Sequence, residues 1–137
     1  MRMNIVELED GVKLIIDCYN ANPDSMKAAL DVLSKFEGRK IAILGDMFEL
    51  GEYAVNLHKE VGRYCIDKCD ILISIGEYAK HYYEAAKDNI ESYYFNNKEE
   101  ALEFIKLNIK KDDVLLIKAS RGMELEYISD NLKEHRK

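Results

Sequence analysis

The chain has no long apolar run: no hydrophobic segment comes near the roughly 18 residues that a membrane-crossing helix requires. The N-terminal segment MRMNIVELEDG also lacks the apolar core of a signal peptide. Cysteine is scarce, and the three thiols, Cys18, Cys65 and Cys69, are an odd number without a CxxC pair. Such usage is typical of free thiols in a reducing cytosol. We therefore expect a cytoplasmic chain that contacts no membrane.

Motifs of several enzyme classes are absent as well. The sequence contains no GxxxxGK(S/T) phosphate loop and no GxGxxG turn, so it has no recognisable means of holding a triphosphate or dinucleotide alone. It has no GxSxG nucleophile elbow. No second His or Cys stands at ligand spacing from His58, which predicts a half-buried structural histidine and no metal site. The chain has 26 acidic and 20 basic residues, and the resulting net charge of -6 disfavours nucleic acid as a partner.

What the sequence does contain is a globular balance of 47% hydrophobic and 34% charged residues over 137 positions, which suits one domain. Short β-branched runs alternate with longer amphipathic segments. Strands are expected over residues 12–16, 40–44, 71–75, 93–95 and 114–117, and helices over 24–36, 53–67, 77–87, 97–109 and 122–133. A turn sequence, Glu9-Asp10-Gly11, predicts a hairpin within residues 2–16. This pattern predicts a monomeric α/β, Rossmann-like three-layer domain: a mostly parallel sheet with helices on both faces and an N-terminal antiparallel edge hairpin.

Polar or charged loops follow four of the expected strands: residues 17–23 (DCYNANP), 45–51 (GDMFELG), 74–77 (SIGE) and 118–122 (KASRG). Ligands of parallel sheets bind outside the C-terminal ends of the strands, so we expect these loops to line one rim. Asp17 ends a buried strand, where a carboxylate needs donors or a ligand hydroxyl. An acid at this position commonly accepts a hydrogen bond from a ribose, which makes Asp17 a candidate nucleotide ligand.

The first and last of these loops each leave an alternative open. Asn22, which precedes the single proline, fits a helix N-cap as well as a ligand contact. Tyr19 packs either over a base or over the sheet edge. In the last loop, Lys118, Ser120 and Arg121 stand just before a helix N-terminus. This arrangement favours an anion site for carboxylate or phosphate over a pair of solvated surface cations.

Three segments carry long and specific motifs: RM(x)7G(x)3IIDCYNANPDSMKAAL, ILGDMFELGEYAVNLHKEVG and LLIKASRGMELE. Together they resemble the C-terminal domain of the Mur ligases of peptidoglycan synthesis, in particular the branch that joins D-alanyl-D-alanine to UDP-N-acetylmuramoyl-tripeptide. The resemblance runs from about Arg2 to Leu132. Two positions depart from the family pattern: Cys18 stands where serine is common, and Ala119 stands where the family usually has glycine.

The resemblance implies an ATP-dependent amide ligase of cell wall biogenesis, which serves cell shape and cell division. The full enzyme, with ATP and Mg²⁺, would phosphorylate the terminal carboxylate of the UDP-linked tripeptide, and the amine of D-alanyl-D-alanine would then attack the acyl phosphate. Residues 1–137 would be the third domain, beginning at an inter-domain boundary, without the N-terminal and central ATP-binding domains. Alone, the chain is expected to bind no cofactor tightly and to be inactive.

The resemblance also implies roles for individual residues. Those on the nucleotide side would be Arg2, Asp17, Tyr19, Asn20 and Asn22. Those on the acceptor side would be Lys118, Ser120 and Arg121. Three further motif residues would hold loops in place: Asp46, Glu49 and His58. No catalytic residue is expected in this domain, and substitutions of Asp17, Lys118 or Arg121 should leave stability almost unchanged, because none of these side chains is expected to form part of the core.

A second hypothesis is a free-standing signalling or binding module such as a phospho-receiver domain. The size, the acidity, the parallel fold and the trio Asp17, Asp46 and Lys118 favour that comparison. Receivers, however, pair two acids after the first strand and carry the phosphate-accepting aspartate after the third. Asp17 has no acidic neighbour, and Asp46 follows the second strand of the parallel series, so the ligase hypothesis is preferred.

Overall fold

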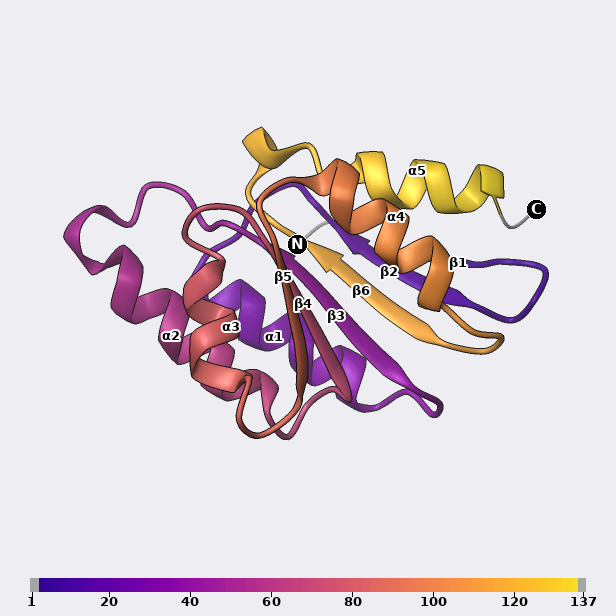
Figure 1. Ribbon diagram of the computed structural model, residues 1–137, viewed down its shortest axis with the longest axis horizontal. Helices are drawn as coiled ribbons and strands as arrows, with labels where there is room; N and C mark the ends of the chain where they lie inside the picture. The colour runs from indigo at the N-terminus through magenta and orange to yellow at the C-terminus, as the bar shows by residue number, and fades with distance from the viewer. Residues whose placement is uncertain (1–2, 136–137) are drawn as a thin grey trace.

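Six strands form one sheet in the order β1-β2-β6-β3-β4-β5 in the computed structural model, which describes residues 3–135 (Figure 1). The strands are β1 (Asn4–Glu7), β2 (Lys13–Asp17), β3 (Lys40–Gly45), β4 (Ile71–Ile75), β5 (Glu91–Phe95) and β6 (Val114–Lys118). β1 runs antiparallel to β2, and every other pair of neighbours is parallel. The predicted N-terminal edge hairpin is therefore confirmed.

Helices cover both faces of this sheet (Figure 1). One face carries α1 (Pro23–Ser34), α2 (Ala54–Cys65) and α3 (Lys80–Ala86), and the other carries α4 (Lys98–Asn108) and α5 (Glu126–His135). Alternation along the strands explains the two layers, because Leu14 and Ile16 of β2 pack in the core under α4 and α5, whereas Ile15 packs under α1 to α3. The predicted three-layer α/β domain is confirmed. No helix within residues 3–135 is long and apolar enough to span a membrane.

Helix boundaries differ from the expected ones where the backbone leaves the helical region. The helix expected over 122–133 starts only at Glu126, because Glu124 adopts a left-handed backbone (φ 52°) that ends a 3-10 helix, η2 (Arg121–Met123). A second 3-10 helix, η1 (Gly51–Tyr53), leads into α2. A side-chain pattern with a period close to 3.6 does not reveal these breaks, since the apolar face continues across them.

The connection after β6 determines where a ligand can bind. β6 lies between β2 and β3, and the chain that leaves its C-terminal end turns to the face covered by α5. The chains that leave β2 and β3 turn to the opposite face, towards α1 and α2. Ligands of open parallel sheets bind at such reversals, outside the C-terminal ends of the strands. The fold therefore points to the loops that follow β2, β6 and β3.

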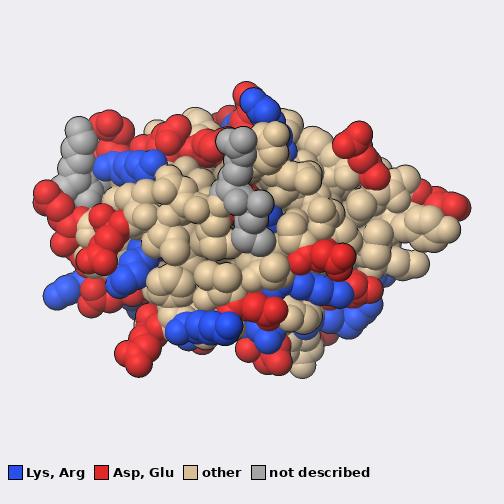
Figure 2. Space-filling view, turned by 180° about the vertical axis from the view of Figure 1, so that it is seen from behind, with Lys and Arg blue, Asp and Glu red and all other residues tan. Residues whose placement is uncertain are grey.

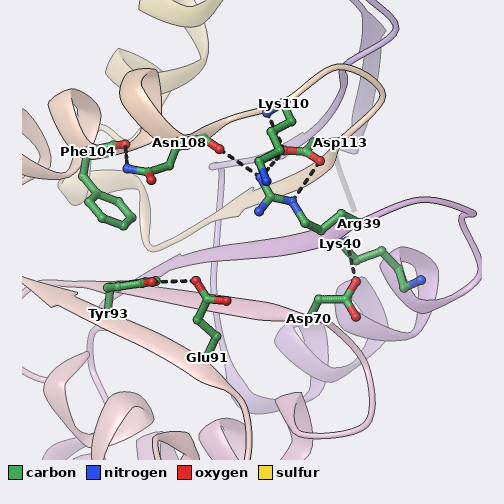
Figure 3. Close-up of polar contacts among 9 residues, drawn as sticks. All are labelled: Arg39, Lys40, Asp70, Glu91, Tyr93, Phe104, Asn108, Lys110 and Asp113. Atoms are coloured by element: carbon green, nitrogen blue, oxygen red, sulfur yellow. Dashed lines mark hydrogen bonds and ion pairs between the residues drawn. The ribbon is translucent and has the colours of Figure 1, made fainter.

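At the opposite end of the sheet, where the parallel strands begin, an ion pair joins two segments of the chain (Figure 3). Arg39, just before β3, donates from Nε and Nη2 to the two carboxylate oxygens of Asp113, just before β6, at 3.0 and 2.7 Å. The same carboxylate accepts the Lys110 N–H at 2.7 Å, and Arg39 Nη2 also donates to the Asn108 carbonyl at 2.9 Å. These contacts join the segment entering β3 to the segment entering β6, so they set the relative positions of the two central strands.

Asp113→Ala should lower the free energy of unfolding by about 1–2 kcal/mol, because it removes a buried acceptor of charge-assisted hydrogen bonds while the Arg39 guanidinium can still reach water. Urea denaturation of the chain measures this change. Glu103→Ala is a matched control, since Glu103 forms only a surface pair with Lys106 at 3.7 Å, and it should cost less than about 0.5 kcal/mol. Equal losses in the two variants would contradict the role given to Asp113.

Candidate functional site

The loops after the parallel strands meet at one rim, as the sequence predicts. The Ser120 N–H donates to the Asp46 carbonyl at 3.0 Å, and the Phe48 N–H donates to Ser120 Oγ at 2.8 Å, so the loops after β6 and β3 bind each other directly. The Ala79 N–H donates to Asp46 Oδ1 at 2.7 Å, which adds the turn after β4. The helix expected to begin at residue 77 begins only at Lys80, because residues 77–79 form this turn. The rim is therefore a connected structure rather than four independent loops.

Asp17 and Lys118 form a buried ion pair at the centre of this rim. Lys118 Nζ lies 2.7 Å from Asp17 Oδ2 and also donates to the Asn20 carbonyl at 2.8 Å. The exposed fractions of Asp17 and Lys118 are only 2% and 1%. The donor that the Asp17 carboxylate needs is thus the Lys118 ammonium. The two residues lie side by side because β2 and β6 are paired, with Asp17 opposite Lys118. The expectation that neither side chain forms part of the core is wrong.

Arg121 is the exposed cation of the rim. Its guanidinium lies over the ring of Tyr19, 5.5 Å from the ring centroid, and Tyr19 is half exposed. Two open hollows flank it, of about 460 and 540 Å³, and Arg121 and Glu126 line both. The remaining residues of the first hollow are Asn4, Ile16, Cys18 and Tyr19, and those of the second are Lys98, Glu124, Tyr127 and Asp130. An exposed guanidinium between two hollows suits a carboxylate or phosphate ligand.

The remaining residues of the first loop serve its own backbone. Asn22 caps α1: its side chain accepts the Ser25 N–H at 2.8 Å, and its N–H donates to Ser25 Oγ at 3.0 Å. The N-cap prediction is confirmed. Asn20 Oδ1 accepts the Ala21 N–H at 3.0 Å. Arg2, also expected on the nucleotide side, lies outside the described residues.

Asp46 and Glu49, both in the loop after β3, differ in burial. Asp46 is buried, and burial raises the pKa of its carboxyl while the N–H groups of Ala79, Tyr78 and Glu77 act in the opposite direction. Glu49 is exposed and has a left-handed backbone (φ 63°). The Asp46 carboxylate thus binds the backbone of a neighbouring turn, whereas the Glu49 side chain faces solvent.

His58 is completely buried, not half-buried as expected from its helical spacing. Its Nδ1 lies 2.6 Å from the Ala54 carbonyl, which can only accept, so Nδ1 carries the proton. Nε2 then accepts the Met47 N–H at 3.0 Å. The rings of Tyr78 and Tyr82 pack against the imidazole with centroid distances of 5.5 and 5.0 Å. Burial disfavours the imidazolium and lowers the pKa of His58 below its ordinary 6.5.

The lowered pKa of His58 predicts a loss of stability in acid. The unfolded chain takes up this proton at a higher pH than the folded chain. The contribution of neutral His58 to the free energy of unfolding is therefore complete above about pH 6.5 and is lost as the pH drops through the folded pKa. Between pH 7.5 and 5.5 the free energy of unfolding should fall more steeply for the wild type than for His58→Gln. Asp46 titrates in both proteins, so the difference isolates His58. The free energy of unfolding is measured by urea denaturation at each pH, and an equal decrease in the two proteins would contradict this prediction.

Residues 1–121 match the family model described as Mur ligase, glutamate ligase domain. The chain belongs to the Mur ligase family. The UDP-N-acetylmuramoyl-tripeptide–D-alanyl-D-alanine ligase of Bacillus subtilis is 39% identical over 142 residues, which cover 98% of this chain and 31% of that ligase. The chain thus spans less than a third of the length of this curated relative.

Solved structures of Mur ligases have the same fold. The MurF ligase from Thermotoga maritima in complex with ADP superimposes with a TM-score of 0.79 at 28% identity, over 96% of this chain and 30% of that chain. MurF from Acinetobacter baumannii gives a TM-score of 0.83 at 30% identity, over 96% of this chain and 29% of that chain. The receiver hypothesis is not supported. Receivers have the strand order 2-1-3-4-5, whereas here β6 separates the first two parallel strands of the chain.

Proposed function

We propose that the chain is the C-terminal, third domain of an ATP-dependent ligase that joins D-alanyl-D-alanine to UDP-N-acetylmuramoyl-tripeptide. The observation that carries this proposal is the 39% identity, over 98% of the chain, to a ligase of that name. The domain would supply contacts to the nucleotide and to the acceptor dipeptide. The remainder of the ligase would hold the tripeptide and the phosphates of ATP.

The residues at the first loop fit one edge of a nucleotide. Tyr19 offers a half-exposed ring, and the Asp17 loop offers hydrogen-bonding groups beside it. ATP, when bound, supplies the phosphoryl group that activates the tripeptide carboxylate. We assign Mg²⁺ to the remainder of the ligase, where it would bind together with the phosphates of ATP. The ADP in the Thermotoga maritima MurF supports a nucleotide ligand for the family.

The acceptor side is best assigned to Arg121. Its exposed guanidinium lies beside two hollows and can pair with the free carboxylate of D-alanyl-D-alanine. Lys118 was expected to share this role, but its ammonium is buried and already bound to Asp17 and Asn20. We therefore assign Lys118 to the support of the first loop. Ser120 stays a candidate acceptor ligand next to Arg121.

The surface around the rim suits contact with another domain. Large hydrophobic side chains are exposed on the loops there: Tyr19, Phe48, Tyr53 and Tyr78. Figure 2 shows a broad, mostly uncharged area that extends towards the end of the molecule bearing the loop after β3, while charged side chains gather along the lower margin and at the opposite end. Closure of this surface over the rest of the ligase would exclude water, which would otherwise hydrolyse an acyl phosphate intermediate.

Acceptor selectivity tests this function. The full-length ligase that contains this domain is incubated with ATP, UDP-N-acetylmuramoyl-tripeptide and one of four acceptors: D-alanyl-D-alanine, D-glutamate, L-alanine or diaminopimelate. We expect ADP release and a product of the mass of the pentapeptide with D-alanyl-D-alanine only. Ligation of a single amino acid in preference to the dipeptide would overturn the proposal and assign the chain to another branch of the family.

The chain alone should bind ATP only weakly, at millimolar concentration or above. It would contribute contacts to the adenosine side, but its sequence has no loop for the β- and γ-phosphates. Isothermal titration calorimetry of the 137-residue chain with ATP measures this affinity. Micromolar binding would contradict the proposed division of labour and favour a self-sufficient nucleotide-binding protein.

A further inference from the structure

The loop that leaves β3 is held at each residue by a different partner. The Gly45 carbonyl accepts the Tyr82 hydroxyl at 2.9 Å. The Asp46 carboxylate accepts the Ala79 N–H, the Met47 N–H donates to His58 Nε2, and the Phe48 N–H donates to Ser120 Oγ. These partners come from α3, the turn before α3, α2 and the loop after β6. The last residue of β3 and the three irregular residues that follow it are thus each fixed in place by a contact from outside the loop.

Ser120 and its neighbours rest on this loop. The Ser120 N–H donates to the Asp46 carbonyl at 3.0 Å while its Oγ accepts from Phe48 at 2.8 Å, so Ser120 binds the loop at two points. The Phe48 ring packs against Gly122, where an added Cβ would lie 2.8 Å from a ring carbon. Arg121 stands between Ser120 and Gly122. The backbone on both sides of the guanidinium is therefore held by residues 46–48.

His58 is a deeply buried part of this support. It is completely buried between two tyrosine rings, and its Nδ1 proton is committed to the Ala54 carbonyl. Only the Nε2 lone pair is left for the Met47 N–H, which is itself in a buried residue. Loss of that acceptor would leave a buried N–H unpaired, and the loop would shift to satisfy it.

We propose that His58 is a positioning residue for the acceptor substrate: by accepting the Met47 N–H it fixes residues 45–48, and through them it orients Ser120 and Arg121. This inference rests on the proposed function. The first loop has separate supports, namely the bonds from Lys118 to Asp17 and Asn20 and the α1 cap. His58 should therefore affect the use of the acceptor dipeptide and leave the use of ATP unchanged.

Two substitutions of His58 separate positioning from packing. In His58→Gln the amide can accept from Met47 and donate to Ala54, so both hydrogen bonds are kept. In His58→Leu the apolar volume is kept and both bonds are lost. In the full-length ligase, we expect His58→Leu to raise the KM for D-alanyl-D-alanine about five- to tenfold with the KM for ATP within about twofold, and His58→Gln to restore the wild-type value. Ile105→Ala, a core substitution within α4, is the control for lost stability and should leave both KM values unchanged.

The pH profile provides a second measurement if His58→Leu does not fold. Protonation of His58 removes the Nε2 acceptor, and the titratable groups nearest the ring are Tyr78, Tyr82 and His81. The acceptor KM of the wild type should rise more than that of His58→Gln as the pH falls through the lowered pKa of His58, while protonation of the substrate amine is common to both. Equal pH profiles of the two proteins from pH 7.5 down to about 4.5 would overturn the proposal, as would equal effects of His58→Leu on both substrates. A wild-type ligase inactive with D-alanyl-D-alanine would instead refute the proposed function.

Discussion

Lys118→Met should lower the free energy of unfolding of this chain by about 3–5 kcal/mol, the usual cost of removing one partner of a buried ion pair. The substitution keeps the length of the side chain but leaves the Asp17 carboxylate, 2% exposed, without its counter-ion. The Asn20 carbonyl also loses its donor. Since domains are stable by only about 5–15 kcal/mol, urea denaturation should show a large shift in midpoint.

A double-mutant cycle identifies the cause of that loss. Asp17→Asn in the Lys118→Met background removes the stranded charge and should recover much of the stability, so that the two changes are strongly non-additive. Lys111→Met is a matched control, because Lys111 is exposed, and it should change the free energy of unfolding by less than about 0.5 kcal/mol. A loss at Lys118 no larger than the loss at Lys111 would show that the buried pair contributes nothing.

Arg121→Ala in the full-length ligase should lower kcat/KM for D-alanyl-D-alanine about ten- to a hundredfold. The loss of the charge-assisted hydrogen bonding between the guanidinium and the dipeptide carboxylate costs about 1.5–3 kcal/mol, which accounts for this factor. The use of ATP and the stability should change little, since Arg121 is exposed. Arg121→Lys should recover only part of the activity, because an ammonium cannot bind a carboxylate in the bidentate manner of a guanidinium.

Steady-state kinetics with each substrate varied in turn measures these effects. Arg63→Ala is the control, since Arg63 is an exposed arginine of α2. A rise in the KM for ATP with unchanged use of the dipeptide would reverse the assignment and give Arg121 to the nucleotide.

The layered fold could be predicted because it depends on local patterns. Short apolar runs such as residues 114–117 and the helical periodicity between these runs are visible in the sequence, and a turn sequence marks the edge hairpin. The break before α5 was not visible, because it depends on the left-handed backbone of Glu124. Glutamate has no special preference for that conformation, so only the surrounding structure selects it.

The candidate site was predicted in its location but not in its internal contacts. The family resemblance assigned Asp17 and Lys118 to different substrates, and nothing in either segment, 101 positions apart, shows that β2 and β6 are neighbours. Their pairing follows from strand order, which is a tertiary property. His58 was expected to be half-buried for a similar reason: the helix pattern reveals its apolar face, but not the two tyrosines that cover the ring.

The central position of β6 has a consequence for how the chain acquires its structure. β6 is the last of the six strands to be synthesised, yet it lies between β2 and β3 and pairs with both of them. Until it is present, a nascent chain has two separate groups of strands, β1–β2 and β3–β4–β5, each with an open edge. Closure then requires pairings across about one hundred residues, which makes folding slow relative to a helical domain of the same size. The complete sheet can therefore form only after residue 118 has left the ribosome, and until then both groups of strands expose edges that could pair with another chain.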